Sequence, residues 1–347
     1  MALTLHVDAA RWRSHLAATV AANPGLIPVV KGNGYGFGLD LLLAECARLH
    51  GSSGVGMIAV GTYGEAPLAL AGFPGDVLVM EPYRPVIHGT VPQLGEGALV
   101  HTISHGPDLE DLAGRVGRPR IVVEGLSPMN RHGIPADWMQ PALEALAPSE
   151  LVALSLHLPL GSGHVAEVRR WVDRFAVREV SEWQLSHVSP TEQNELRAAY
   201  PDRTFRVRMG TQLWLGDPRA CRVTGHVLDV RHVSTGDRAG YRGKRLRAGW
   251  LLVVAGGTAH GVALEAPSGA DSVRQRAVAL AEGALEAAGR IRSPFRVSGR
   301  TTWFVEPPHM QVSLIVLPEG SSPPEVGEQV DVRVRNTTLH PDAVVFE

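Results

Sequence analysis

The chain has 347 residues, of which 44% are hydrophobic and 20% charged, and its formal net charge is −2 at pH 7. This composition is that of a globular protein and excludes a disordered chain, and the length is sufficient for two domains. The nearly neutral charge gives no reason to expect a nucleic acid or an anionic membrane surface as a partner.

The cysteines and the N-terminal residues further narrow the class of protein to which the chain can belong. Cys46 and Cys221 are the only cysteines, which excludes a disulfide scaffold and a cysteine-rich zinc site. The scattered histidines lead us to predict no metal site. The N-terminus lacks the pattern of a signal peptide, and no apolar run is long enough to span a bilayer. We therefore expect a cytoplasmic protein without a membrane partner.

The first two thirds of the chain alternate short β-rich runs with helical patterns. A helix is predicted over residues 8–22, and strands follow at residues 26–31, 56–61, 76–81, 99–104, 120–125, 151–158, 182–187 and 205–210. Helical patterns separate most of them, at residues 39–49, 107–116, 141–146, 165–178 and 191–200, while the connection after the third strand is the weakest helix prediction. Eight strands alternating with helices predict a parallel (β/α)₈ TIM barrel.

A doubly wound open sheet fits the same alternation less well. Such a sheet would normally carry a G-x-G-x-x-G turn after its first strand. The stretch VVKGNGYGFG at residues 29–38 has glycines at alternate positions instead. The spacing therefore favours the barrel.

After about residue 217 the pattern changes to strands and turns. Strands are predicted within residues 221–233, 247–257, 295–305, 311–317 and 328–336, with a helical insertion at residues 271–289. This pattern predicts a second, mostly β domain, either a small barrel or a sandwich. The predicted domains are residues 1–216, the (β/α)₈ barrel, and residues 217–347, the C-terminal β domain.

Polar residues stand at the carboxyl ends of the predicted barrel strands, where a (β/α)₈ barrel carries its active site. They are Lys31, Tyr35, Glu124, Arg131, His157, Ser189, Arg208, Gly210 and Thr211. The loops after strands seven and eight are also where such barrels commonly bind a phosphate. A desolvated lysine can form a Schiff base with an aldehyde. Together these residues predict a site for pyridoxal phosphate.

Three stretches carry a resemblance to a known family. VVKGNGYGFG closely resembles the pyridoxal-phosphate signature of alanine racemases, usually close to AVVKANAYGHG. MNRHG at residues 129–133 and VRMGTQLW at residues 207–214 resemble that family's M-x-R-x-G and VRPGIALY motifs. The resemblance covers the whole chain, because those enzymes also join a (β/α)₈ barrel to a C-terminal β domain. It implies an isomerase of amino-acid metabolism, a racemase dependent on pyridoxal 5'-phosphate.

The resemblance also implies roles for individual residues. Lys31 would hold the cofactor as an internal aldimine and serve as one of two acid/base groups. Arg208 would face the pyridine nitrogen; because an arginine stays protonated, the ring would remain a poor electron sink, which suits simple proton removal and return. Arg131 would reach the cofactor's phenolic oxygen or the substrate carboxylate. The phosphate would be bound by Tyr35, Ser189, Gly210 and Thr211.

Glu124 is a variation on the family pattern. It stands seven residues before Arg131, where many relatives carry a lysine modified into a carbamate. A glutamate would supply the same negative charge without modification. We therefore predict that Glu124 supports Arg131 and that its replacement by glutamine weakens cofactor binding or activity.

The C-terminal half departs from the family. The family's second base is a tyrosine in a G-Y-A-D-G motif, and the best match, GGTAHG at residues 256–261, has Thr258 at the tyrosine position and His260 at the aspartate position. A histidine can ionise near neutral pH, whereas a threonine hydroxyl cannot. We therefore predict His260 as the second base, ahead of His309 and Tyr241. The family's R-V-C-M-D-Q-T-M signature is also replaced, by WFVEPPHM at residues 303–310.

Three functions are compatible with this pattern. The first is an amino-acid racemase with a displaced second base. The second is a pyridoxal-phosphate enzyme that uses Lys31 alone, for aldol cleavage, dehydration or decarboxylation of an amino acid. The third is a non-catalytic protein that binds the cofactor or another ligand. By the resemblance, a neighbouring subunit's C-terminal domain would complete the site, which predicts a head-to-tail homodimer acting on a small amino acid.

Overall fold

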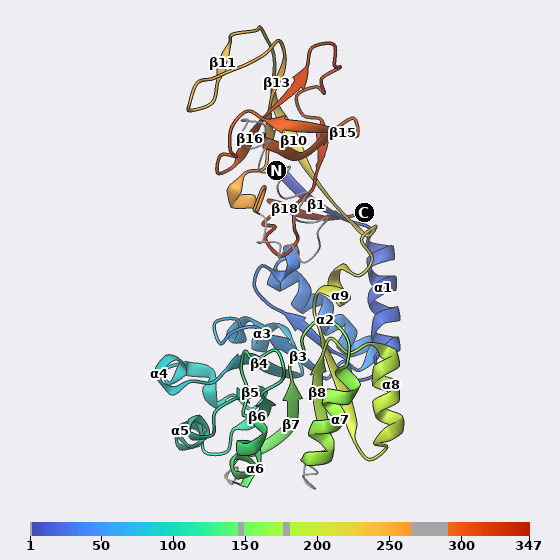
Figure 1. The fold of residues 1–347 in the computed structure, drawn as a ribbon, viewed down its shortest axis with the longest axis vertical. Helices are drawn as coiled ribbons and strands as arrows, with labels where there is room; N and C mark the ends of the chain where they lie inside the picture. Colours follow the sequence, from blue (N-terminus) through green and yellow to red (C-terminus); the bar gives the residue numbers. More distant parts are fainter. Residues whose placement is uncertain (1, 145–148, 176–180, 265–290) are drawn as a thin grey trace. The chain divides into compact units, whose positions relative to one another are not determined.

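The computed structural model describes residues 2–144, 149–175, 181–264 and 291–347. The chain forms two compact units (Figure 1). The barrel unit holds Arg13–Gly34 and Leu39–Gly216, and the β unit holds Met1–Trp12, Tyr35–Gly38 and Asp217–Glu347. The predicted barrel domain, residues 1–216, differs from this division in two segments, one of which contains Tyr35.

The barrel unit is built on a closed parallel barrel of eight strands. They are β2 (Ile27–Val30), β3 (Met57–Val60), β4 (Asp76–Pro82), β5 (Leu99–Ile103), β6 (Arg120–Gly125), β7 (Glu150–Leu156), β8 (Glu182–Ser186) and β9 (Thr204–Met209). The strand β2 pairs with both β3 and β9, which closes the ring. All eight predicted strands are present within two residues at each end, so the predicted (β/α)₈ fold is confirmed.

Helices cover the outside of these strands (Figure 1). The helices of the described segments are α1 (Ala9–Ala22), α2 (Leu39–Ser53), α3 (Ala66–Gly72), α4 (Pro85–His88), α5 (Gly106–Val116), α6 (Ala136–Glu144), α7 (His164–Arg174), α8 (Pro190–Ala199) and α9 (Thr211–Leu215), with short 3₁₀ turns η1 (Gly34–Gly36), η2 (Pro92–Gly95) and η3 (Thr258–His260). The weak helix prediction after the third strand corresponds to the short α4 and η2.

Some predicted helix boundaries differ from the structure. The helix predicted at residues 39–49 continues to Ser53. The sequence predicts a further helix at residues 141–146, which corresponds to α6. The helix begins at Ala136, and Pro141 lies inside it. Met139, upstream of the proline, is buried and anchors the first turns, which the local sequence pattern does not reveal.

The barrel interior is largely apolar, and a polar exception is the buried Gln184 of β8, whose amide nitrogen lies 3.5 Å from the sulfur of Met57. A cluster from six of the strands fills it: Ile27, Val29, Met57, Ala59, Leu78, Val100, Val122 and Ala153. Strands buried on both faces are typically continuous apolar runs, as in the buried run IPVV of β2. The filled interior leaves the strand ends as the place for polar chemistry.

The β unit contains a mostly antiparallel sheet. Its strands are β1 (Leu3–Val7), β10 (Cys221–Val233), β13 (Gly249–Ala255), β14 (Ile291–Val297), β15 (Arg300–Phe304), β16 (Val312–Pro318), β17 (Gln329–Val332) and β18 (Ala343–Phe346), and a separate pair is formed by β11 (Arg238–Ala239) and β12 (Lys244–Arg245). The strands run in the order β13-β16-β15-β14-β17-β10, and a pairing between β13 and β10 joins the two ends of this run. The second, mostly β domain is therefore confirmed, and it takes the barrel-like form.

The N-terminal strand β1 is an addition that the sequence analysis did not predict. It extends the sheet of the β unit by pairing with β10 on one side and with β18 on the other. The predicted helical insertion at residues 271–289 lies outside the described residues. None of the helices in the described segments is long and apolar enough to cross a membrane.

Candidate functional site

Lys31 follows the last residue of β2 and lies at the carboxyl-end rim of the barrel. Its side chain is solvent-accessible. Partial burial lowers its pKa, and the positive charges of Arg131 and Arg208 lower it further, while the carboxylate of Glu65 opposes them. A lysine with a lowered pKa carries a larger fraction of neutral amine at neutral pH, so Lys31 is suited to attack a carbonyl carbon or to exchange a proton.

Arg208 is the buried cation of the site. It lies near the end of β9, exposes 6% of its surface, and has an Nε atom without a hydrogen-bond acceptor among the described residues. Its Nη2 makes one long bond of 3.5 Å to the carbonyl of Leu156. Burial lowers its pKa, and the nearby carboxylate of Glu124 counteracts this. A buried N–H donor without an acceptor is costly, and it fits an acceptor atom of a bound ligand.

Glu124 is the buried carboxyl group near it, close to the end of β6, with 4% of its surface exposed. Burial raises its pKa, while the charges of Arg208, Arg131 and His132 act in the opposite direction. The charge of Arg131 acts on Glu124, as the predicted support of Arg131 requires, and that of Arg208, which the sequence did not indicate as a partner, acts more strongly.

The loop after β6 presents Arg131. It returns to the strand through hydrogen bonds of the N–H of Ile134 to the carbonyl of Glu124 (2.8 Å) and of the N–H of Leu126 to the carbonyl of Ile134 (2.9 Å). Gly133 has a φ of +130°, and a Cβ there would lie 2.5 Å from the carbonyl carbon of Gly125. The glycine of the MNRHG motif is thus required by close backbone packing that holds the Arg131 loop.

Two histidines lie at the ends of β7 and β8. The rings of His157 and His187 meet edge to face, with centroids 5.5 Å apart. Burial and the charges of Arg208 and Arg131 lower the pKa of His157 to about 3. Nδ1 of His187 donates to the carbonyl of Leu158 at 2.6 Å. His157 is therefore a neutral group at physiological pH, able to offer one donor and one acceptor.

The predicted phosphate-binding residues lie at two helix starts. Ser189 caps α8, but its hydroxyl donates to the carboxylate of Glu192 (2.7 Å) and accepts a bond from the N–H of the same residue (3.3 Å). Gly210 and Thr211 begin α9. Ser189 would have to exchange its capping bonds to contact a phosphate, whereas Gly210 and Thr211 present backbone at the end of β9. Tyr35, the other predicted contact, belongs to the β unit and has a φ of +56°.

The predicted second base, His260, is enclosed within the β unit. It exposes 7% of its surface; its Nδ1 accepts a bond from the N–H of Gly257 (3.2 Å), and its Nε2 lies 3.3 Å from a carboxylate oxygen of Asp342. Both ring nitrogens are thus engaged. Thr258, at the position of the family tyrosine, is exposed. The contacts of His260 are those of a structural histidine.

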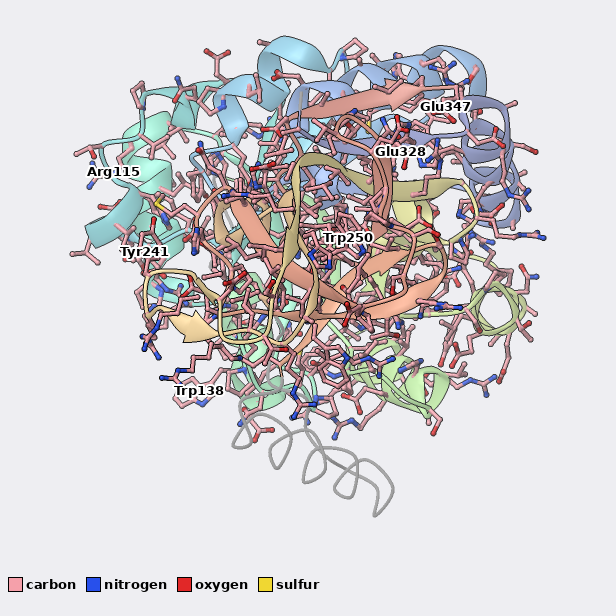
Figure 2. All side chains as sticks on the ribbon, turned by 90° about the horizontal axis from the view of Figure 1, so that it is seen from above. Arg115, Trp138, Tyr241, Trp250, Glu328 and Glu347 are labelled. Atoms are coloured by element: carbon pink, nitrogen blue, oxygen red, sulfur yellow. The ribbon has the colours of Figure 1, made fainter. Side chains whose placement is uncertain are left out.

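A second group of titratable residues lies in the β unit, and its histidine, His309, is more exposed than His260. Nε2 of His309 lies 2.6 Å from Oε1 of Glu306, whose buried carboxylate also accepts from the N–H of Tyr241 at 2.9 Å. Tyr241, on the hairpin of β11 and β12, is 88% exposed (Figure 2). Its ring is tilted by 37° against that of His309, with centroids 4.5 Å apart. Burial would raise the pKa of Glu306, but the hydrogen bonds outweigh it and lower the pKa.

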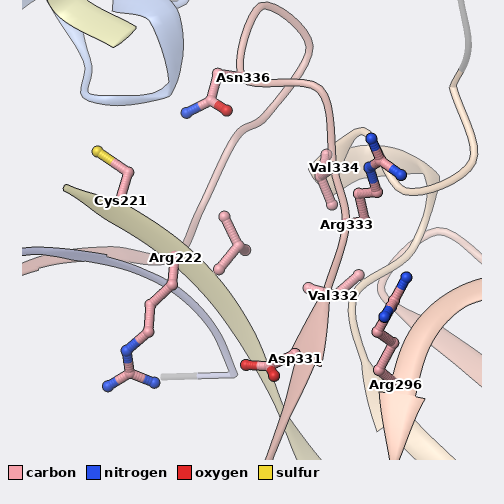
Figure 3. Close-up of a pocket in the computed structure, with 9 residues that line it drawn as sticks. Cys221, Arg222, Arg296, Asp331, Val332, Arg333, Val334 and Asn336 are labelled. Carbon is pink, nitrogen blue, oxygen red and sulfur yellow. The ribbon is translucent and has the colours of Figure 1, made fainter. Parts of the chain in front are cut away.

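The β unit also contains a hollow of about 490 Å³ lined by polar and apolar groups. Arg222, Arg296 and Arg333 lie on its wall, but Arg222 points to one side and the other two point to the opposite side (Figure 3). The three guanidinium groups therefore do not converge on one anion.

His101 and His105 have the H-x-x-x-H spacing of some metal ligands. In the structure His101 instead accepts a bond from the hydroxyl of Tyr63 (3.0 Å) and donates to the carbonyl of Leu94 (3.2 Å). Within the described segments, no three histidine, cysteine, aspartate or glutamate side chains gather as metal ligands would.

Comparisons with known proteins agree with this architecture. Residues 6–213 match the model of the alanine racemase N-terminal domain. The fold is similar to that of alanine racemase from Bartonella henselae, solved with covalently bound pyridoxal phosphate, at 15% identity and a TM-score of 0.71 over 100% of both chains. A comparison with curated protein sequences finds no match.

Two further solved structures show the same fold. Alanine racemase from the D-cycloserine producer Streptomyces lavendulae has 18% identity and a TM-score of 0.68, over 100% of this chain and 97% of that one. Histidine racemase from Leuconostoc mesenteroides subsp. sake has 14% identity and a TM-score of 0.68, over 99% of this chain and 98% of that one.

Proposed function

Because the chain belongs to the alanine racemase family, we propose that it is an amino-acid racemase that depends on pyridoxal phosphate and uses Lys31 as its reacting amine. The observation that carries this proposal is the setting of Lys31, an accessible lysine whose pKa is lowered by burial and by two arginines. The family's racemases and the bound cofactor of the Bartonella henselae enzyme support it.

The residues at the barrel rim fit the cofactor. Lys31 would hold it through the side-chain amine, and the buried Nε of Arg208, which lacks an acceptor among the described residues, would donate to an acceptor atom of its ring. When bound, pyridoxal phosphate would withdraw electrons and thereby acidify the α-hydrogen of an amino acid. Tyr35, Ser189, Gly210 and Thr211 would contact the phosphate.

The remaining groups would bind and orient the amino acid. Arg131 is exposed at the rim and would attract a carboxylate, while Glu124, when ionised, would balance its charge and that of Arg208. His157 would contribute a neutral hydrogen-bonding group. Nζ of Lys31 would carry a proton to or from the α-carbon on one face. Racemisation needs a second group for the other face, and a homodimer is the assembly expected to supply it.

Lys31 and Lys244 are the only two lysines of the chain, which makes the test specific. The purified protein with pyridoxal phosphate should be yellow and should lose this colour with borohydride. After this reduction the cofactor should be found covalently attached to Lys31. Incubation with single amino acids in deuterated water should place deuterium at the α-carbon of both enantiomers. Lys31→Ala should abolish colour and exchange, and Lys244→Ala should retain both.

The same experiment identifies the alternatives. Exchange into one enantiomer only, or release of a new product, would indicate an enzyme that uses Lys31 alone. Colour without exchange for any amino acid would indicate a cofactor-binding protein. Exchange that persists in Lys31→Ala would reject the assignment of Lys31.

A further inference from the structure

One carboxylate connects the ends of β2 and β3 beside Lys31. Glu65 lies in the loop after β3, directly before α3, and is half-buried. Its Oε1 accepts a hydrogen bond of 2.6 Å from the N–H of Gly32, the residue that follows Lys31. Its Oε2 accepts bonds from the N–H groups of Gly61 (2.6 Å) and Thr62 (3.1 Å). Three backbone donors therefore fix this carboxylate in place.

The lysine stem and the carboxylate both pack against Gly61. A Cβ at this position would lie 3.0 Å from Oε2 of Glu65 and 3.1 Å from the Cβ of Lys31. The absence of a side chain at Gly61 therefore lets the Lys31 stem approach the end of β3. Because Glu65 bonds to both Gly32 and Gly61, it fixes the two backbone segments between which this stem lies.

The charge of Glu65 also acts on Lys31. Burial lowers the pKa of Lys31 most, and three charged groups act on it as well; two of them, Arg131 and Arg208, carry the same sign as its ammonium. Glu65 is the anion among these three. His157, whose pKa these positive charges lower, is neutral at physiological pH. Glu65 therefore limits how far the arginines and burial lower the pKa of Lys31.

We propose that Glu65 is the positioning residue of Lys31: its carboxylate fixes the backbone on which the lysine stands and supplies the balancing charge. This inference rests on the proposed function only in taking Lys31 as the reacting amine. It assigns Glu65 no contact with substrate. Its effect is on the orientation and the protonation of Lys31.

The test uses the cofactor-free protein, so that it does not depend on turnover. Wild type, Glu65→Gln and Glu65→Asp are labelled with acetic anhydride between pH 6 and pH 11, and Lys244 provides the internal reference. Removing the negative charge should lower the pH of half-maximal labelling of Lys31 in Glu65→Gln by about one unit. Glu65→Asp keeps the charge and should lie closer to wild type.

Amide hydrogen exchange measures the geometric part separately. Gly32, Gly61 and Thr62 should exchange at least about tenfold faster in Glu65→Gln and in Glu65→Asp, because neither side chain can keep all three bonds at its present position. The matched control is Glu81→Gln, which removes a carboxylate near the end of β4 that bonds weakly to the N–H of Tyr63 at 3.4 Å. It should change neither the labelling curve of Lys31 nor the exchange rates of the three amides.

The two proposals fail in different ways. If Lys31 reacts with pyridoxal phosphate but Glu65→Gln leaves its labelling curve and the three amides unchanged, Glu65 is not its positioning residue. An equal effect of Glu81→Gln would reject the inference as well. If wild-type Lys31 does not react with pyridoxal phosphate at all, the proposed function fails, whatever the Glu65 variants show.

Discussion

Glu306 holds His309 in a single arrangement through the 2.6 Å contact between Oε1 and Nε2. Because hydrogen bonds lower the pKa of Glu306, its carboxylate stays ionised and Nε2 of His309 carries the hydrogen. A hydrogen on Nε2 leaves Nδ1 as the nitrogen that can accept a proton, which is the arrangement of a general base oriented by a carboxylate. His260 lacks such an acceptor, since both of its nitrogens are engaged.

The first prediction concerns the second proton-transfer group. If the protein racemises an amino acid, His309→Gln should slow α-hydrogen exchange of one enantiomer by about a hundredfold or more and leave exchange of the other enantiomer nearly intact. Deuterium incorporation, followed for each enantiomer separately, measures this. His232→Gln is the matched control in the same unit, because that ring is exposed and packs edge-on against Trp250.

His260→Gln should behave differently. It removes the bonds to Gly257 and Asp342 and should cost about 1 kcal/mol of unfolding free energy with little effect on exchange. A one-sided loss of exchange in His260→Gln, with His309→Gln unaffected, would instead make His260 the second base.

The second prediction concerns His157 and acid. Its pKa is about 3 in the folded chain, while an unfolded histidine takes up a proton near pH 6.5. As pH falls below about 6.5, the unfolded state therefore binds more protons and the folded state loses stability. Because the ring is only partly buried and solvent screens its charge, His157→Gln should remove about 1 kcal/mol of this loss between pH 7 and pH 5, as measured by urea unfolding. Parallel curves for both proteins would contradict it.

The third prediction concerns Glu124, whose contribution to stability changes with pH in the opposite direction to that of His157. Burial raises the pKa of Glu124 in the folded chain, so the unfolded state releases its proton at a lower pH. Its contribution is therefore favourable below the unfolded pKa and is lost as pH rises toward the folded pKa. Relative to wild type, Glu124→Gln should gain unfolding free energy as the pH is raised from 4 to 8. A difference that does not depend on pH would reject this.

The fourth prediction concerns the glycine that holds the Arg131 loop. Gly133→Ala would place a Cβ 2.5 Å from backbone atoms at a φ of +130°, and it should cost about 3 kcal/mol or more of unfolding free energy. Gly161→Ala is the matched control, because its φ is +132° and nothing lies within 4 Å of the added Cβ. It should cost only about 1 kcal/mol. Equal thermal shifts in the two variants would show that packing at Gly133 is unimportant.

Much of the barrel could be predicted from the sequence, because its strands are short apolar runs separated by helical patterns. The resemblance to the alanine racemases, based mainly on the residues around Lys31, was confirmed by the family match. The strand β1 was missed because Leu3–Val7 has no turn or partner nearby in the sequence, and it pairs only with residues more than two hundred positions away. The roles of the predicted site residues stay predictions.

What the sequence by itself determined is the order of the barrel strands and several of the polar residues at their carboxyl ends, since parallel strands place these ends together wherever the barrel closes. Only the tertiary structure decided which of them are buried, which charged groups lie near them and which hydrogen bonds they make. It buries Arg208 and Glu124, brings Glu65 to the backbone beside Lys31, and engages both nitrogens of His260. Burial and through-space charge depend on distances between residues far apart in the chain, and a sequence pattern does not contain these distances.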